Sequence, residues 1–184
     1  MNTDDPNIKA IRDSFARVVY SHKTYEKARE LAGSRAEVVK WTNLILTTVT
    51  SGTLLSTLIT NQKILLYVGS AFAAATLAFT IFQLSFDPAK EAERYRATAK
   101  ELWYVREKYI HLLTDIKAGT PDISIVRCRN ELVEELKLIY KFAPDTSSRA
   151  YKAAQNALQV NEEMTFSDEE VDKFLPSSLH SRSS

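Results

Sequence analysis

Side chains that commonly carry catalysis or bind metals are few in this chain and lie far apart. The three histidines are His22, His111 and His180, and Cys128 is the single cysteine. This spacing matches neither a metal-ligand set nor a nucleophile with its base, so we expect His22 and His111 to be packing or surface residues. A facing pair of these two histidines is the alternative, because it would titrate near neutral pH. Cys128 lies on an apolar stripe, where a thiol is usually an inert core residue.

Phosphate-binding and acid–base patterns are also missing from the sequence. The four glycines are scattered and form no P-loop or dinucleotide-binding loop: Gly33, Gly52, Gly69 and Gly119. Glu134 with Glu135 and Glu162 with Glu163 are sequence neighbours on predicted helices, so the members of each pair point in different directions. We therefore predict a protein that is not an enzyme and that has no catalytic, cofactor-binding or metal site.

The composition argues against nucleic acid as a direct partner. Lysine plus arginine number 24 and aspartate plus glutamate 23 in 184 residues, which gives a formal net charge of +1. Proteins that bind nucleic acid usually carry a clear excess of basic residues. A single cysteine excludes an intrachain disulfide and suits soluble parts in a reducing cytosol. Residues 1–40 are charged throughout, so we expect no secretory signal there.

A long block in the first half of the chain is almost free of charge. Between Trp41 and Phe86 the only charged residue is Lys63. We predict two membrane-spanning helices here, residues 42–60 and 64–86, of roughly 28 Å and about 34 Å against a hydrocarbon core of about 30 Å. Residues 61–63 leave room only for a tight antiparallel hairpin, and the lipid bilayer is its expected partner. The alternative is a buried hairpin inside a soluble all-helical protein, which would need a larger covering shell.

Basic residues flank both outer ends of this hairpin. The five nearest to each end are Lys23, Lys27, Arg29, Arg35 and Lys40 before the first span, and Lys90, Arg94, Arg96, Lys100 and Arg106 after the second. The turn contributes only Lys63. Cytoplasmic segments next to membrane spans carry an excess of lysine and arginine, so we place both termini in the cytoplasm.

Outside the hairpin the apolar residues recur with helical spacing, so the predicted fold class is an all-α membrane protein with a small cytosolic helical bundle. We expect a cytosolic helix in residues 1–40 opening near Pro6, the hairpin in 41–86, cytosolic helices in 87–160, and a short helix with a flexible tail in 161–184. Two stripes should pack together: Ile8, Ile11, Phe15, Val18, His22, Tyr25, Ala32, Ala36 and Val39 with Tyr95, Ala99, Leu102, Trp103, Val105, Tyr109, Leu112 and Ile116.

Helix breaks are predicted at three places in the C-terminal half. Gly119 suits a helix C-cap and Thr120 with Pro121 suits the start of the next helix. The apolar stripe of that helix is Ile125, Cys128, Leu132, Leu136 and Ile139. The segment FAPDTSS separates it from RAYKAAQNAL. Ser167 and Glu170 have capping-box spacing for a last helix that ends at Pro176.

The first span carries its polar side chains mainly on one side. At ~100° per residue most of them fall within an arc of roughly 140°: Thr42, Asn43, Thr47, Thr50, Thr53, Thr57, Thr60 and Asn61. Such a stripe can pack on the partner span, pack on another subunit or line water. Helix packing alone could account for it, because threonine hydroxyls bond back to the carbonyl one turn earlier. Our pore-lining candidates are Asn43, Thr47, Thr50, Thr53, Thr57 and Thr60.

The second span has small residues at the spacing that lets another helix approach closely. Gly69 and Ala73 form one such row, and Ser70, Ala74 and Ala78 form a second. These five residues are our helix-packing candidates. Two spans cannot enclose a conduit alone, so any aqueous path requires a homo-oligomer, and we predict self-association.

The order of a long cytosolic helix, a two-span hairpin with a minimal turn and the segment AERYRATAKELWYVREKY resembles the SLATT families. These are two-transmembrane effector domains associated with nucleotide-based bacterial conflict systems. The segments KFAP, RAYKAAQNAL and TFSDEEVDKFLP also resemble the C-terminal extension of a subgroup linked to reverse transcriptases. The resemblance covers most of the chain and brings no catalytic residues with it.

The resemblance implies an antiviral effector, a multi-pass protein of the bacterial inner membrane. Such an effector would oligomerise and perturb or perforate the membrane when a sensor protein from a nucleotide cyclase or reverse transcriptase system triggers it, and so halt the infected cell by abortive infection. Two alternatives remain: a membrane-anchored scaffold that recruits a partner enzyme through its cytosolic helices, and a soluble helical regulator with a buried hairpin.

Overall fold

The computed structural model describes residues 6–60, 62–119 and 121–174, and within these ranges the chain forms helices and no strand. The elements in chain order are α1 (Pro6–Thr60), α2 (Lys63–Ser85), α3 (Pro88–Ala118), α4 (Asp122–Phe142), α5 (Ser148–Gln159) and α6 (Asp168–Asp172). The predictions that concern Asn61, Thr120, Pro176 and His180 fall outside the described residues. The predicted all-α fold is confirmed.

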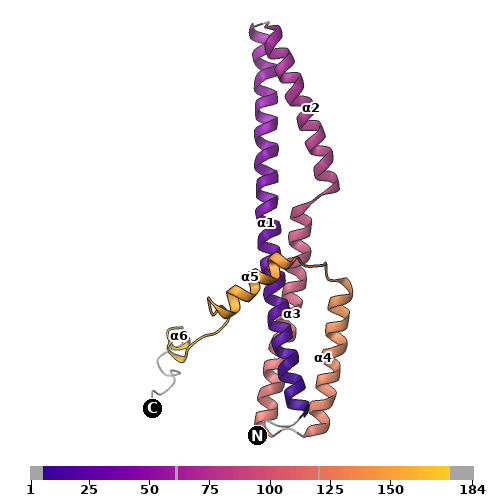
Figure 1. The fold of residues 1–184 in the computed structure, drawn as a ribbon, viewed down its shortest axis with the longest axis vertical. Coiled ribbons are helices and arrows are strands. Elements are labelled where there is room, and N and C mark those ends of the chain that lie inside the picture. Colours follow the sequence, from indigo (N-terminus) through magenta and orange to yellow (C-terminus); the bar gives the residue numbers. More distant parts are fainter. Residues whose placement is uncertain (1–5, 61, 120, 175–184) are drawn as a thin grey trace.

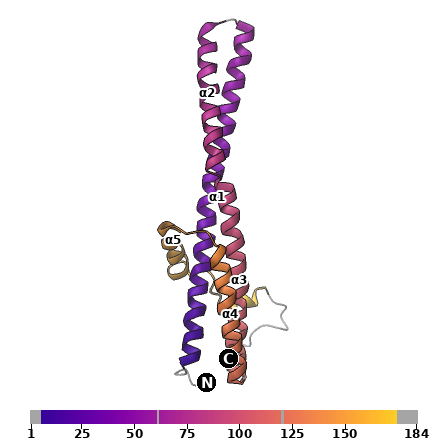
Figure 2. The same ribbon diagram turned by 90° about the vertical axis from the view of Figure 1, so that its right-hand side faces the viewer.

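Helix α1 runs without a break from the helical bundle outside the hairpin into the first span. It contains no proline beyond Pro6, and its two glycines do not interrupt it, so nothing in the sequence stops the helical hydrogen bonding at residue 40. Figures 1 and 2 show α2 beside the upper half of this rod and α3 beside the lower half. The 55-residue helix therefore links the membrane hairpin rigidly to the bundle below it.

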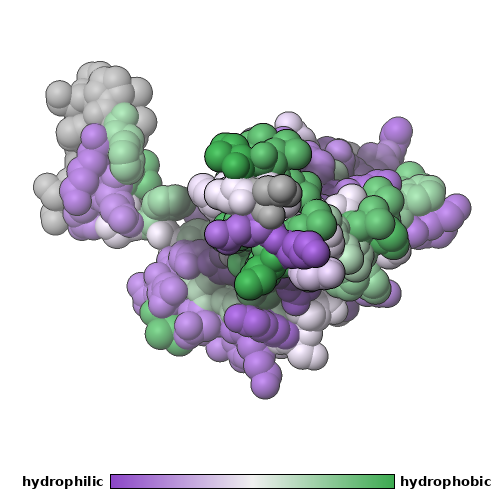
Figure 3. Space-filling model, turned by 90° about the horizontal axis from the view of Figure 1, so that it is seen from above, coloured by the Kyte–Doolittle hydropathy of each residue, from purple (hydrophilic) through white to green (hydrophobic). Residues whose placement is uncertain are grey.

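The upper part of the molecule is the helical hairpin predicted from the charge-free block. Both α1 and α2 contain a window long and apolar enough to cross a membrane, and 0% and 6% of these windows are buried within the chain. Large apolar side chains such as Leu58, Ile59 and Leu84 face outward. Figure 3 looks down the long axis onto the turn and shows hydrophobic residues beside the polar ones of the tip. A soluble core helix would be covered instead, so lipid is the environment that this surface fits.

Below the hairpin, α1 packs along α3, and α4 runs back beside α3. The core contains most of the two stripes predicted to pack together, with Ile11, Leu102, Val105 and Tyr109 fully buried. Ala36 and Val39, at the upper end of the first stripe, lie outside it. Trp103, on the edge of its stripe, is 42% exposed. The helical bundle thus closes around most of the side chains that helical periodicity selects.

The loop between α4 and α5 is tied to both long helices. The phenol of Tyr25 on α1 donates a hydrogen bond to the carbonyl of Pro144 at 3.1 Å, and the phenol of Tyr95 on α3 donates to the carbonyl of Asp145 at 2.9 Å. Burial, followed by the hydrogen bond to Glu91, raises the pKa of Tyr95 to about 12. Ala150 then fixes the start of α5 in the core. These contacts hold α5 across α1 near the base of the hairpin.

The helix ends confirm the predicted breaks. Gly119 adopts φ +91°, which L-residues with a side chain rarely adopt, and it ends α3. Asp87 caps the start of α3, since its carboxylate accepts the N–H groups of Ala89 and Lys90 at 3.1 and 3.0 Å. The hydroxyl of Ser167 accepts the N–H of Glu170 at 3.3 Å and starts α6. These three helix ends are therefore encoded locally.

Replacing Leu102 by alanine should destabilise the helical bundle by about 2–5 kcal/mol, because the side chain is fully buried between α1 and α3 and leaves a cavity. Denaturant unfolding of the full chain in detergent, followed by circular dichroism, measures the loss. The exposed neighbour Glu101→Ala serves as the control and should change the stability by less than about 0.5 kcal/mol. Equal effects of the two substitutions would contradict the assignment of this core.

Candidate functional site

The polar stripe of the first span lies against α2 in the single chain. Asn43, Thr50, Thr53 and Thr57 are half-buried on one side of α1, and Thr50 and Thr53 of these four contact α2. Gly69 is the one buried residue of α2, and a Cβ built on it would lie 3.0 Å from the Thr53 hydroxyl oxygen. Close approach of the two backbones at this point therefore depends on glycine. We call these four residues of α1 the polar seam.

The hydroxyl groups of the polar seam bond mostly to their own helix. Thr50, Thr53 and Thr57 each donate to the carbonyl four residues earlier, at 2.7 to 2.9 Å. One contact crosses the hairpin, between the hydroxyl oxygens of Thr50 and Thr76 at 3.2 Å. The threonine hydroxyls thus find their hydrogen-bond partners within α1, and α2 is held mainly by packing. A hydroxyl that bonds to its own helix costs little free energy in a membrane span.

The remaining predicted residues of the hairpin point elsewhere. Thr47 and Thr60 are exposed, and Thr60 donates to the carbonyl of Ser56 at 2.7 Å. On α2, Gly69 and Ala73 turn toward α1, whereas Ser70, Ala74 and Ala78 are exposed. The two rows of small residues therefore separate: one packs inside the hairpin, and the other lies on its outer surface, where no part of the described chain covers it.

Two further polar residues, both on α2, lie opposite the polar seam and are not among the predicted candidates. Thr76 contacts Thr50, and Gln83 is half-buried with an amide nitrogen that has no hydrogen-bond partner among the described residues. In the antiparallel register set by the contact of Thr50 with Thr76, Gln83 lies near the level of Asn43. The sequence contains a signal for Gln83: it is the only amide side chain within the second span. An amide without a hydrogen-bond partner is costly in lipid, so its presence there indicates a polar contact.

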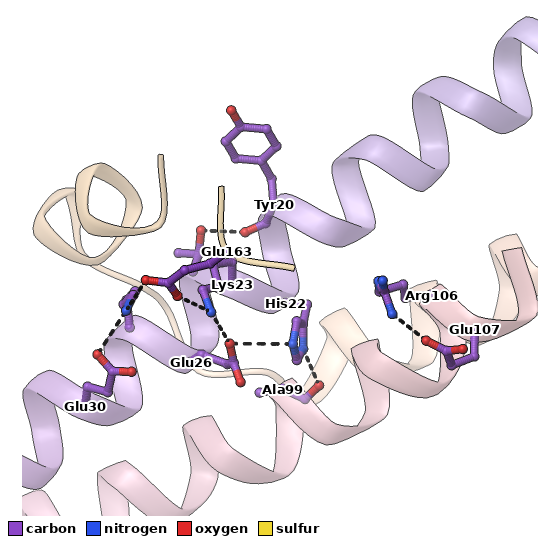
Figure 4. A network of polar contacts seen from close by, with 11 residues as sticks. Tyr20, His22, Lys23, Glu26, Glu30, Ala99, Arg106, Glu107 and Glu163 are labelled. Carbon is purple, nitrogen blue, oxygen red and sulfur yellow. Dashed lines mark hydrogen bonds and ion pairs between the residues drawn. The ribbon is translucent and has the colours of Figure 1, made fainter. Parts of the chain in front are cut away.

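A second polar cluster joins α1 to the segment after α5 (Figure 4). Lys23 is buried, with 7% of the residue exposed. Its ammonium group forms ion pairs with Glu163 at 2.7 Å and with Glu26 at 2.8 Å. Lys27 reaches Glu163 at 3.6 Å. Burial opposes the charge on Lys23, but the hydrogen bonds to Glu163 and Glu26 outweigh it and raise its pKa. These four residues fasten the C-terminal segment to α1.

His22 is a buried packing residue, as predicted. It is 4% exposed, its ring lies 5.3 Å from that of Trp103 between centroids, and its Nδ1 donates to the carbonyl of Ala99 at 2.9 Å. Burial lowers the pKa of His22, and the hydrogen bond to Ala99 offsets this only in part. His111 is exposed and lines a groove with Asp115. It lies about three turns along α3 from Ala99, which His22 contacts, so the two histidines do not form the facing pair.

Lowering the pH from 7.5 to 5.5 should reduce the thermal stability of the full chain in detergent. Because the folded pKa of His22 lies below the ordinary value of 6.5, the unfolded chain takes up the proton first, and stability present above pH 6.5 is lost as the pH falls below it. Circular dichroism melts across this window measure the slope. His22→Gln should flatten it and His111→Gln should keep it; an unchanged slope in His22→Gln would contradict this assignment. Glu163, whose pKa is lowered from 4.5, titrates below the window.

Cys128 corrects one prediction. The sequence pattern places it on the buried stripe of α4, but the thiol is exposed. It lines the groove between α3 and α4 beside His111 and Asp115, because α4 is covered on one side only and the edge of its stripe stays open. No group of three or more His, Cys, Asp or Glu residues among those the structure describes is placed to hold a metal ion.

Comparison with known protein families gives one match. The model of the family described as "SMODS and SLOG-associating 2TM effector domain family 4" matches residues 8–170, which include both spans, the helical bundle and α5. No curated protein and no solved structure matches the chain.

Proposed function

We propose, from the premise that this chain belongs to family 4 of the SMODS and SLOG-associating 2TM effector domains, that it self-associates and perturbs or perforates the membrane when an upstream sensor triggers it. The chain is a two-span membrane protein of a family of effector domains. A bacterial inner membrane with both termini in the cytoplasm is the location that the basic residues at the outer ends of the hairpin favour.

The observation that carries the proposal is the polar seam. Asn43, Thr50, Thr53 and Thr57 lie half-buried on one side of α1, where Thr50 and Thr53 contact α2. Large apolar side chains dominate the exposed surface of the hairpin, with single hydroxyl residues such as Thr47 and Ser56 between them. A passive anchor needs no polar side chains at this depth. If α2 moves away from α1, the seam is uncovered in the plane of the membrane, where contact with copies of itself or with water is favoured over lipid.

The hydrogen bonding of the seam opposes this movement only weakly. Separating α2 from α1 breaks the hydroxyl contact between Thr50 and Thr76 and the packing of Gly69 on Thr53, but the threonine bonds to their own helix stay intact. The exposed row of Ser70, Ala74 and Ala78 supplies a surface on which a neighbouring subunit can pack closely. In an oligomer, the seams of several subunits would then line a leak path, with Thr47 extending it.

The trigger would act through the cytosolic helices. The loop between α4 and α5 is bonded to α1 and α3 by Tyr25 and Tyr95, close to the base of the hairpin. The two states are the closed hairpin and the hairpin in which α2 has moved away from α1. A sensor shifts the population from the first to the second only to the extent that it binds the bundle more tightly in the second. A sensor from a nucleotide cyclase or reverse transcriptase system is the partner that we propose.

A scaffold is the second candidate, and one observation favours it. The hydroxyls of Thr50, Thr53 and Thr57 are satisfied within α1 and pack on α2, so the hairpin is complete as a passive anchor in a single chain. Its cytosolic helices would then recruit a partner enzyme.

Expression with and without the trigger separates the two candidates. A potential-sensitive dye in cells that express the full chain should report collapse of the membrane potential in the triggered state, with the membrane fraction unchanged in amount. An intact potential under all conditions, including strong overexpression, would favour the scaffold and exclude the proposed effector mechanism.

A further inference from the structure

An amphipathic groove opens at the base of the hairpin. It has a volume of about 780 Å³ and lies between α1, the lower end of α2 and the start of α5. Its apolar lining includes Val38, Val39, Phe82 and Phe86, and its basic lining is Arg35 and Arg149. Figure 1 shows α2 diverging from α1 toward this end, which leaves the space open. The size falls within the range of ligand-binding cavities.

The two arginines of the groove have no acidic partner among the residues that the structure describes. Neither guanidinium forms an ion pair within 4.0 Å there, and both side chains are exposed. The groove also contains two carboxylates that keep their charge and do not pair with either arginine: Asp87 accepts the N–H groups that open α3, and Glu91 accepts the Tyr95 phenol at 2.9 Å. Two such guanidiniums beside an apolar wall are complementary to an anionic group that carries a hydrocarbon chain.

The position of the groove along the hairpin matches the edge of the membrane. Trp41 is 56% exposed one turn above Val38, and Asp87 is the first charged residue after the second span. Tryptophan is enriched at the boundary between hydrocarbon and headgroups. In a bilayer that the hairpin spans, this position would put the apolar wall at the level of the acyl chains and the arginines near the depth of the lipid phosphates.

We propose that this groove binds one anionic glycerophospholipid of the cytosolic leaflet. The guanidiniums of Arg35 and Arg149 hold the phosphate and the anionic headgroup, and an acyl chain lies along Val38, Val39, Phe82 and Phe86. The bound lipid fills the space between α1 and α2 where the two helices diverge. The proposal stands independently of pore formation, because a passive anchor would bind the same lipid.

Lipid retention by the purified full chain tests the proposal. The protein is reconstituted in nanodiscs with equal amounts of phosphatidylglycerol and phosphatidylcholine, extracted in mild detergent, and analysed by native mass spectrometry. The wild type should retain one phosphatidylglycerol per chain, with about a tenfold preference over phosphatidylcholine. Arg35→Gln with Arg149→Gln should abolish the preference. Ser85→Trp should lower retention by filling the groove while both arginines stay.

The control variant Arg29→Gln with Arg96→Gln removes the same charge from exposed positions outside the groove and should retain lipid as the wild type does. An equal loss in the control would show that surface charge alone attracts the lipid, and it would overturn the proposal. Retention that neither the Arg35 and Arg149 pair nor Ser85→Trp reduces would overturn it as well, as would equal binding of the two lipids by the wild type.

Discussion

Replacing Ser70, Ala74 and Ala78 together by leucine should leave the chain in the membrane as a monomer. The three residues form the exposed small-residue row of α2, and leucine side chains there keep a neighbouring backbone at a distance. We expect self-association to weaken by at least about tenfold, which corresponds to about 1.4 kcal/mol. Sedimentation or cross-linking in lipid bilayers at several protein-to-lipid ratios measures it.

A matched pair of single substitutions sharpens this test. Ala74 and Ala75 are both exposed alanines at the same depth of α2, but only Ala74 lies on the row. Ala74→Leu should weaken association and Ala75→Leu should change it little. If the triple variant associates as strongly as the wild type, the interface lies on another surface.

Replacing Thr47, Thr50 and Thr57 together by valine should abolish ion leakage through triggered or overexpressed protein. Valine has nearly the shape of threonine, so Thr50 and Thr57 keep their packing against α2 while the hydroxyl groups are lost. A water path lined by methyl groups loses the polar contacts that stabilise water and ions. Dye or ion efflux from liposomes measures leakage, and insertion is checked by carbonate extraction.

The serine variant of the same three positions is the control for this prediction. Serine keeps each hydroxyl group, so leakage should persist, although the smaller side chains pack less well. Equal leakage by the valine and serine variants would exclude a lining role for the threonines and leave helix packing as their explanation.

Much of the fold follows from local sequence signals. Leu102, Val105 and Tyr109 repeat with helical spacing and lie in the core, and Gly119 and Ser167 mark helix boundaries as predicted. Other features depend on contacts between distant parts of the chain. The ion pair of Lys23 with Glu163 joins residues 140 positions apart, and no local pattern indicates it. Cys128 was misplaced because periodicity identifies a stripe but not how far the neighbouring helix covers it.

The candidate site was predictable in composition but not in orientation. A helical wheel gathers Asn43, Thr50, Thr53 and Thr57 on one side of α1, and the structure keeps them together. The wheel fixes directions only relative to its own helix, so it does not say whether α2, another subunit or water faces the stripe. The separation of the two small-residue rows of α2 follows from the same packing and could be assigned only once Gly69 was seen against Thr53.

The central claim, that the hairpin crosses the membrane twice from the cytosolic side, is tested most directly by the accessibility of cysteines. Cys128 is exposed and is the only native thiol, so it reports the cytosolic bundle, and Gln62→Cys in a Cys128→Ser background reports the turn. An impermeant maleimide applied to intact spheroplasts should label the Gln62→Cys variant, and it should label Cys128 of the wild type only after permeabilisation. Labelling of Cys128 from outside, or recovery of the chain in the soluble fraction without detergent, would contradict the account.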